Sequence, residues 1–110
     1  MFCLALGKIP VPSPGTPVTL AATLAPDQLS LLSPGGGFYK LEAWADTGDT
    51  AVTFVKSATS GHAIAPLPAP ANGHCEHFCI VSNGDALSIH DYAFDATTAN
   101  QGPIVTLWIA

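Results

Sequence analysis

The sequence predicts a single all-β domain, an antiparallel β-sandwich or jelly roll of seven to eight short strands. The 110 residues fit one domain (1–110), and no linker divides them. Ten prolines and ten glycines are spread along the chain and leave no stretch with the 3.6-residue period of an amphipathic helix. Short runs of β-branched and aromatic residues remain between turn residues, at a spacing of roughly ten residues that is typical of sandwiches.

Each of these runs is an expected strand because it is apolar or alternating and is bounded by glycine, proline, asparagine or aspartate. In chain order, the expected strands cover residues 2–9, 16–23, 38–45, 51–56, 77–82, 92–95 and 104–109.

The segments between these strands carry their own signals. Residues 10–17 hold four prolines and are expected to form an extended arm. Residues 27–32 can close one helical turn with Asp27 as its cap, and the turn at residues 46–49 suggests a hairpin. Residues 65–71 hold Pro66, Pro68 and Pro70, which cannot donate ladder hydrogen bonds, so a proline-rich extended loop is expected there.

The charge content is unusually low for a small domain. Only 10% of the residues are charged while 48% are hydrophobic, whereas a typical soluble domain has about 25% charged residues. A surface rich in Thr, Ser, Asn and Gly would explain part of this shortfall. The sharper explanation, which we favour, is that other protein chains cover part of the surface.

The same composition argues against several partners. The net charge is −5, with three lysines and no arginine, so the chain lacks the groups that neutralise phosphates, and no nucleic-acid partner is expected. No apolar run approaches the roughly 20 residues of a membrane span, and the N-terminus lacks the basic region of a signal peptide, so no membrane is expected. Three cysteines are an odd number and exclude a complete disulfide framework, which favours folding in a reducing compartment.

The most concentrated set of possible metal ligands lies between residues 74 and 79. The candidates are His74, Cys75, His77 and Cys79. Alternate strand positions lie about 7 Å apart, too far for two thiolates on one zinc ion without a bulge. We therefore expect a strand here, with no metal and no other cofactor.

Two further patterns suggest alternative functions. Asp46-Thr47-Gly48 resembles the catalytic signature of retroviral-type aspartic proteases, in which two such carboxylates share a proton across a dimer axis. The supporting apolar-apolar-Gly segment of that family is missing, so no catalytic residue is expected and the chain is not expected to be an enzyme. Four aromatic residues could form a sugar-stacking platform, which would make the chain a carbohydrate-binding module. These residues are Tyr39, Trp44, Tyr92 and Trp108.

Two segments, about a quarter of the chain, resemble the opening and the close of small virion structural proteins of tailed bacteriophages. The first is residues 8–20, with its Pro-Gly-Thr-Pro-Val stretch, and the second is residues 91–96 followed by residues 102–107. The resemblance implies a capsid decoration or cement protein without catalytic residues. It also implies trimers that sit over the joints between major capsid subunits.

We therefore expect a virus-particle structural protein that is made in the host cytoplasm and lies on the capsid surface. Its expected partners are further copies of itself, with a trimer as the expected form, and a major capsid protein. Contact would come from the first strand, the arm and the proline-rich loop, since prolines lose little entropy on docking. The expected interface residues are Phe2, Leu4, Ile9, Pro10, Pro12, Pro14, Pro66, Pro68 and Pro70.

Overall fold

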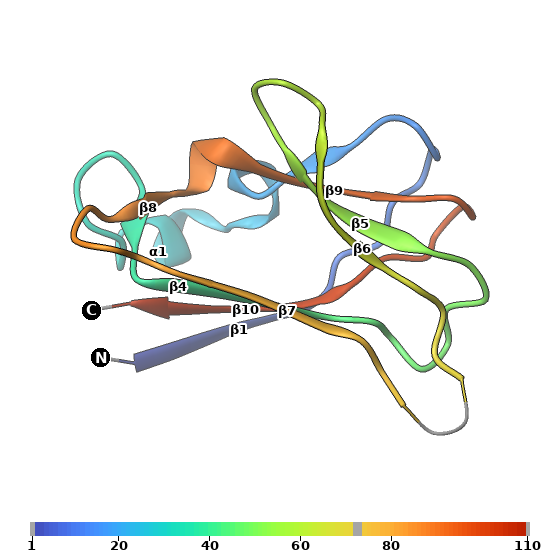
Figure 1. Ribbon diagram of the computed structural model, residues 1–110. Helices are drawn as coiled ribbons and strands as arrows, with labels where there is room; N and C mark the ends of the chain where they lie inside the picture. Colours follow the sequence, from blue (N-terminus) through green and yellow to red (C-terminus); the bar gives the residue numbers. More distant parts are fainter. Residues whose placement is uncertain (1, 72–73, 110) are drawn as a thin grey trace.

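The structure is a computed structural model that describes residues 2–71 and 74–109. Two four-stranded antiparallel sheets face one another, which confirms the all-β sandwich fold (Figure 1). The first sheet has the order β1 (Phe2–Lys8), β10 (Ile104–Ile109), β4 (Lys40–Trp44) and β7 (His77–Val81). The second sheet has the order β2 (Val18–Thr19), β9 (Tyr92–Ala96), β5 (Thr53–Ser57) and β6 (Ala63–Leu67).

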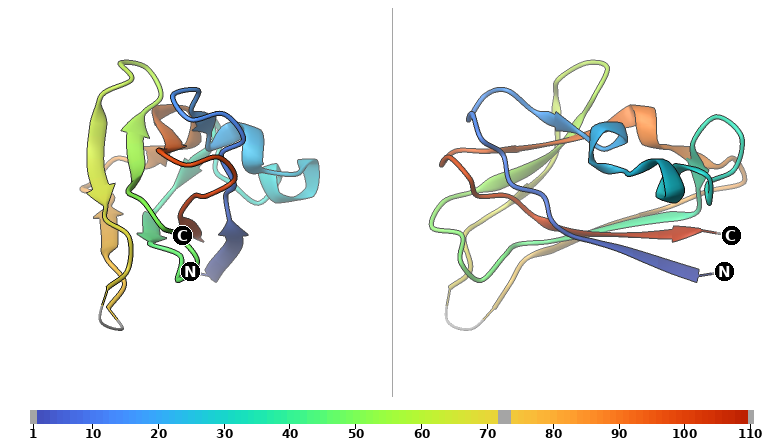
Figure 2. Two further views of the ribbon diagram at one scale, coloured as in Figure 1. Left: turned by 90° about the vertical axis from the view of Figure 1, so that its right-hand side faces the viewer. Right: turned by 180° about the vertical axis from the view of Figure 1, so that it is seen from behind.

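Short elements close the end of the sandwich at which both termini lie (Figure 2). A two-stranded ribbon is formed by β3 (Gly37–Phe38) and β8 (Leu87–Ser88). One α-helical turn, α1 (Pro26–Leu29), and the 3-10 turns η1 (Ala21–Thr23) and η2 (Ile89–Asp91) complete this end.

The core lies between the two sheets because alternate residues of the central strands point inward. Leu41, Val105 and Leu107 of the first sheet are fully buried, and they face Val55 and Phe94 of the second sheet, which are also fully buried. Successive residues of β4 and β10 alternate between buried and partly exposed, so each of these strands has one face toward the core and one toward the outside.

The expected hairpin at residues 46–49 is wrong. The strands on either side, β4 and β5, belong to different sheets, so this turn carries the chain across the sandwich. The turn itself forms as turn chemistry predicts, because the Asp49 amide donates to the Asp46 carbonyl at 2.9 Å. Asp49 is 5% exposed and its carboxylate accepts from the Gly102 amide at 3.4 Å, which anchors the crossing to the start of β10.

Three local expectations are also corrected. The strand expected at residues 16–23 shrinks to Val18–Thr19, because the chain then turns into η1. The helical turn begins at Pro26, and Gln28, not Asp27, caps it by accepting from the Ala25 amide at 2.8 Å. Part of the expected loop at residues 65–71 is strand β6, where Pro66 is tolerated because β6 is an edge strand.

Residues 10–17 do not form the expected extended arm, because the segment bends and makes a turn in which the Thr16 amide donates to the Ser13 carbonyl at 2.9 Å. Val11 is fully buried, its amide donates to the Gln101 carbonyl at 3.0 Å, and its carbonyl accepts from the Asn100 amide. Further along, the Gly15 amide donates to the Asp95 carboxylate at 3.0 Å. The segment is therefore tied down at two points and belongs to the body of the domain.

Candidate functional site

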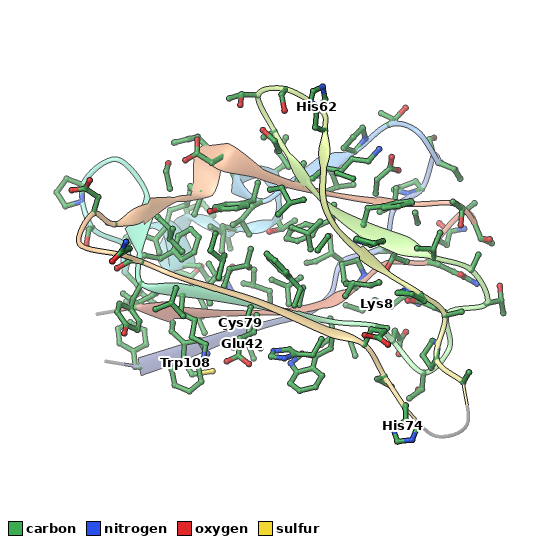
Figure 3. All side chains as sticks on the ribbon, in the orientation of Figure 1. Lys8, Glu42, His62, His74, Cys79 and Trp108 are labelled. Carbon is green, nitrogen blue, oxygen red and sulfur yellow. The ribbon has the colours of Figure 1, made fainter. Side chains whose placement is uncertain are left out.

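The outward-pointing residues of the first sheet form a broad face on the side away from the second sheet (Figure 3). Strand pairing places Cys3 beside Trp108, Trp108 beside Lys40, and Glu42 between Thr106 and Cys79. We call this surface the outer face. It consists of Cys3, Ala5, Lys8, Lys40, Glu42, Trp44, His77, Cys79, Val81, Ile104, Thr106 and Trp108.

Glu42 lies at the centre of the outer face and uses both of its carboxylate oxygens. The Trp108 indole N–H donates to Oε1, and Lys40 Nζ lies 3.5 Å from the same oxygen. His77 Nε2 lies 3.1 Å from Oε2. Three neighbouring strands are therefore connected through one carboxylate.

The aromatic rings around Glu42 are held by this network. The Trp44 ring stacks on the His77 imidazole with centroids 3.9 Å apart, and Lys40 Nζ lies 5.7 Å from the Trp108 ring centroid. These contacts fix the orientation of both indoles while Trp44 stays 40% exposed. The result is a pre-ordered aromatic surface on rigid strands.

The charge of Glu42 is balanced by a lysine on the same face. Burial alone would raise the pKa of Glu42, but hydrogen bonds from Trp108 and His77 and the charge of Lys40 outweigh burial and lower it. Glu42 is therefore ionised at neutral pH and balances the ammonium of Lys40. Lys8, which lies beside Ile104 at the edge of the outer face, is paired with Asp46 at 3.2 Å.

The four residues considered as possible metal ligands do not form one cluster. His77 Nε2 lies 3.1 Å from Glu42, and Cys79 lies opposite Glu42 on the outer face. His74 and the half-buried Cys75 lie in the connection that leads into β7 (Figure 3). No group of three or more His, Cys, Asp or Glu side chains suited to a metal ion occurs in the described part of the chain. All three cysteines are free thiols.

Asp46, the candidate of the protease hypothesis, lies in the crossing turn between the sheets. Its carboxylate is 3.2 Å from Lys8 Nζ, and its backbone amide donates to Asp49 at 3.2 Å. This carboxylate is engaged by a lysine of its own chain, on a turn that is anchored to β10.

The residues expected at an interface differ in how exposed they are. Phe2 is 44% exposed at the end of β1, and Leu4 is partly buried against the core. Ile9 is wrong as a contact residue, because it is only 5% exposed and packs in the core, where its amide donates to the Pro103 carbonyl. The prolines of the two proline-rich segments lie at the surface, and Pro70 is half-buried; they are Pro10, Pro12, Pro14, Pro66, Pro68 and Pro70.

The four aromatic residues of the sugar-platform hypothesis divide into two groups. Tyr92 is 6% exposed and packs edge-on against Phe38 in the core, and Tyr39 is half-buried. Trp44 and Trp108 are on the outer face. Sequence reasoning missed Glu42 and Lys40 as their partners, although the alternation of Lys40, Glu42 and Trp44 with apolar residues was a signal of one common face.

A second surface feature is an open groove of about 550 Å³ beside α1. It is lined mainly by Leu29, Leu32, Pro34, Gly36, Ile89 and His90. Its one titratable side chain among the lining residues is His90, so it offers little chemistry beyond apolar contact.

Within residues 2–71 and 74–109, no helix has the length and apolar character needed to cross a membrane. Comparisons with protein-family models, with curated proteins and with solved structures found no match to this chain.

Proposed function

We propose that this protein is a non-enzymatic structural component of a virus particle, which decorates or cements the capsid through protein–protein contacts. The observation that carries the proposal is the outer face, an aromatic sheet surface whose charged side chains are already paired with groups of the same chain. The assignment to a virus particle rests on the resemblance of residues 8–20, 91–96 and 102–107 to small virion structural proteins of tailed bacteriophages.

The chemistry of the outer face suits a protein partner. Tryptophans at the centre of an interface contribute strongly to binding because they bury large areas with few rotatable bonds. Lys40 and Glu42 already neutralise each other, so a partner can cover them without facing an unpaired charge. Val81, which is 43% exposed, and Ile104 extend the apolar area beyond the two indoles.

The partners that this function requires are further copies of the chain and a major capsid protein. The low overall charge, 10% of residues, supports such contacts because few ionised groups would need to be desolvated. A trimeric form on the capsid surface follows from the phage resemblance and is part of the proposal.

The test is binding of the purified protein to capsids that lack it, measured by co-sedimentation in a density gradient. Trp44→Lys and Val81→Lys should each abolish co-sedimentation, because they place a charge on the outer face. Thr59→Lys, at an exposed position in the turn between β5 and β6, is the matched control and should bind like the wild type. Absence of the wild-type protein from the capsid fractions would refute the proposal.

Carbohydrate binding is a second candidate, because Trp44 and Trp108 lie on one face beside polar groups that can bind hydroxyls. Under this alternative, the wild-type protein would be retained on glycan columns and Trp44→Ala would elute without delay. Retention of the protein by glycans together with failure to bind capsids would favour this alternative over the virion function.

A further inference from the structure

The edge strands of the sandwich differ in how well they are protected against pairing with another chain. In the second sheet, β6 contains Pro66, and β2 is two residues long and follows Pro17. In the first sheet, β7 has five residues and makes contact with β6 of the second sheet. Proline, short length and cover are the usual means by which proteins prevent edge-to-edge association.

Strand β1 has none of these protections. It is the longest strand of the described chain, with seven residues, and it lies at the edge of the first sheet with β10 as its partner. It contains no proline, and its first charged residue is Lys8, at its last position. The unpaired backbone groups of Phe2–Leu6 form an open template for one more strand.

The side chains of β1 are self-complementary about Leu4. An antiparallel copy centred there places Leu4 opposite Leu4, Phe2 opposite Leu6 and Cys3 opposite Ala5. Phe2 and Leu4 are paired with the inward residues Ile109 and Leu107, so they lie on the core side, where Leu6 also packs. Core-side apolar residues would therefore meet core-side apolar residues, and outer-face residues would meet outer-face residues.

Charge and backbone geometry limit the pairing to this segment. Gly7 has φ 72°, and the register of the β1–β10 pairing shifts between Ala5 and Gly7, so Leu6 lies in the irregularity and is the last residue that a second copy would face. Lys8 therefore falls outside the paired segment, and no like charges come together across the two-fold axis.

We infer that β1 is the site at which a second copy of this chain adds, as an antiparallel strand related by a two-fold axis. The two first sheets join into one eight-stranded sheet, and the two outer faces lie side by side on the same side of it. This inference rests on the proposed function, for which it supplies a contact between copies of the chain. It replaces the trimer implied by the phage resemblance with a two-fold dimer as the unit that docks on a partner.

The test is sedimentation of the full chain under reducing conditions over roughly 1 to 500 µM, the range for weak, small interfaces. The wild type should reach the dimer mass as concentration rises. Cys3→Lys combined with Ala5→Lys should weaken dimerisation by about a hundredfold or more, since four ammonium groups would meet at the seam. Cys79→Lys combined with Val81→Lys, on the opposite edge of the same sheet, is the matched control and should dimerise normally.

Register is tested by disulfide formation in a chain whose other cysteines, Cys75 and Cys79, are changed to serine. Ala5→Cys should yield a disulfide-linked dimer on mild oxidation, because residue 5 faces Cys3 of the second copy. Cys3 alone should cross-link much less, since it faces Ala5. Circular dichroism and thermal melts show whether each variant is folded.

The edge pairing is overturned if the wild type stays monomeric or forms trimers only. It is also overturned if the dimer persists in the variant with both Cys3→Lys and Ala5→Lys. Capsid binding by such a protein, lost in Trp44→Lys, would leave the proposed function standing. A β1 dimer that does not bind capsids would instead keep the edge pairing and refute the proposed function.

Discussion

Replacing Lys56 with methionine should destabilise the protein far more than an ordinary surface substitution. Lys56 Nζ lies 2.6 Å from the Asp95 carboxylate, and the Asp95 side chain is only 4% exposed. The second Asp95 oxygen accepts from the amides of Gly15 and Ala96. Methionine would fill a similar volume but leave a buried carboxylate without its counter-charge.

The expected cost is about 3 kcal/mol of unfolding free energy, at the low end for a broken buried pair because the Lys56 side chain is 21% exposed. The chain offers a matched control in Lys8→Met, since Lys8 pairs with Asp46 at 3.2 Å but its side chain is 40% exposed. That substitution should cost less than about 1 kcal/mol. Urea unfolding at pH 7, followed by fluorescence, measures both.

The pH dependence has a definite sign. Burial alone would raise the pKa of Asp95, but Lys56 and the amides of Ala96 and Gly15 outweigh it and hold the pKa below 3.8. The stabilisation by the pair is therefore complete above pH 3.8 and is lost as the pH falls through the lower, folded-state pKa. The difference between the wild type and Lys56→Met should shrink in that acid range.

Two outcomes would refute this reasoning. One is a cost for Lys56→Met no greater than that for Lys8→Met, which would mean that Asp95 is well hydrated. The other is a difference between the wild type and Lys56→Met that stays constant in acid, which would mean that packing, not charge, is responsible.

Two further substitutions test the packing. Thr53 is fully buried, and its hydroxyl is the one buried side-chain polar atom without a hydrogen-bond partner among the described residues. Thr53→Val should therefore raise the unfolding free energy, measured in urea, by about 1 kcal/mol. A loss of stability would show that the hydroxyl has a partner. Gly102→Ala should destabilise by more than about 3 kcal/mol or prevent folding, because its Cβ would lie 1.8 Å from the Ile9 carbonyl oxygen. Gly48→Ala is the control, because the atom nearest to its added Cβ would be 3.7 Å away, and this variant should melt within about 2 °C of the wild type. Equal melting temperatures for the Gly102→Ala and Gly48→Ala variants would contradict the close approach at Gly102.

The sequence predicted the elements whose signals are local. The apolar runs at residues 2–9 and 104–109 became β1 and β10, and the turn residues at 46–49 did form a turn. The sheet to which each strand belongs depends on which apolar faces bury one another. The crossing from β4 to β5 could therefore not be predicted from the sequence. The same holds for Ile9, whose burial depends on contact with Pro103, far along the chain.

The outer face was only partly predictable. Trp44, Trp108 and His77 stood out by residue type, but they lie on three strands whose order in the sheet is not encoded locally. Glu42 had no distinguishing signal of its own, since its role comes from having Trp108, Lys40 and His77 on either side of it. The proline-rich segments gave the opposite result, because their exposure was predicted while their attachment through Val11 and Gly15 was not.

The most direct test of the proposed virion function is a cryo-EM map of intact virus particles purified from cells that produce this chain. If the proposed function is correct, the map contains density for the sandwich on the capsid surface, with Trp44 and Trp108 buried against a neighbouring subunit. A particle without this chain, or a bound chain whose first sheet faces solvent across its whole outer side, would contradict it.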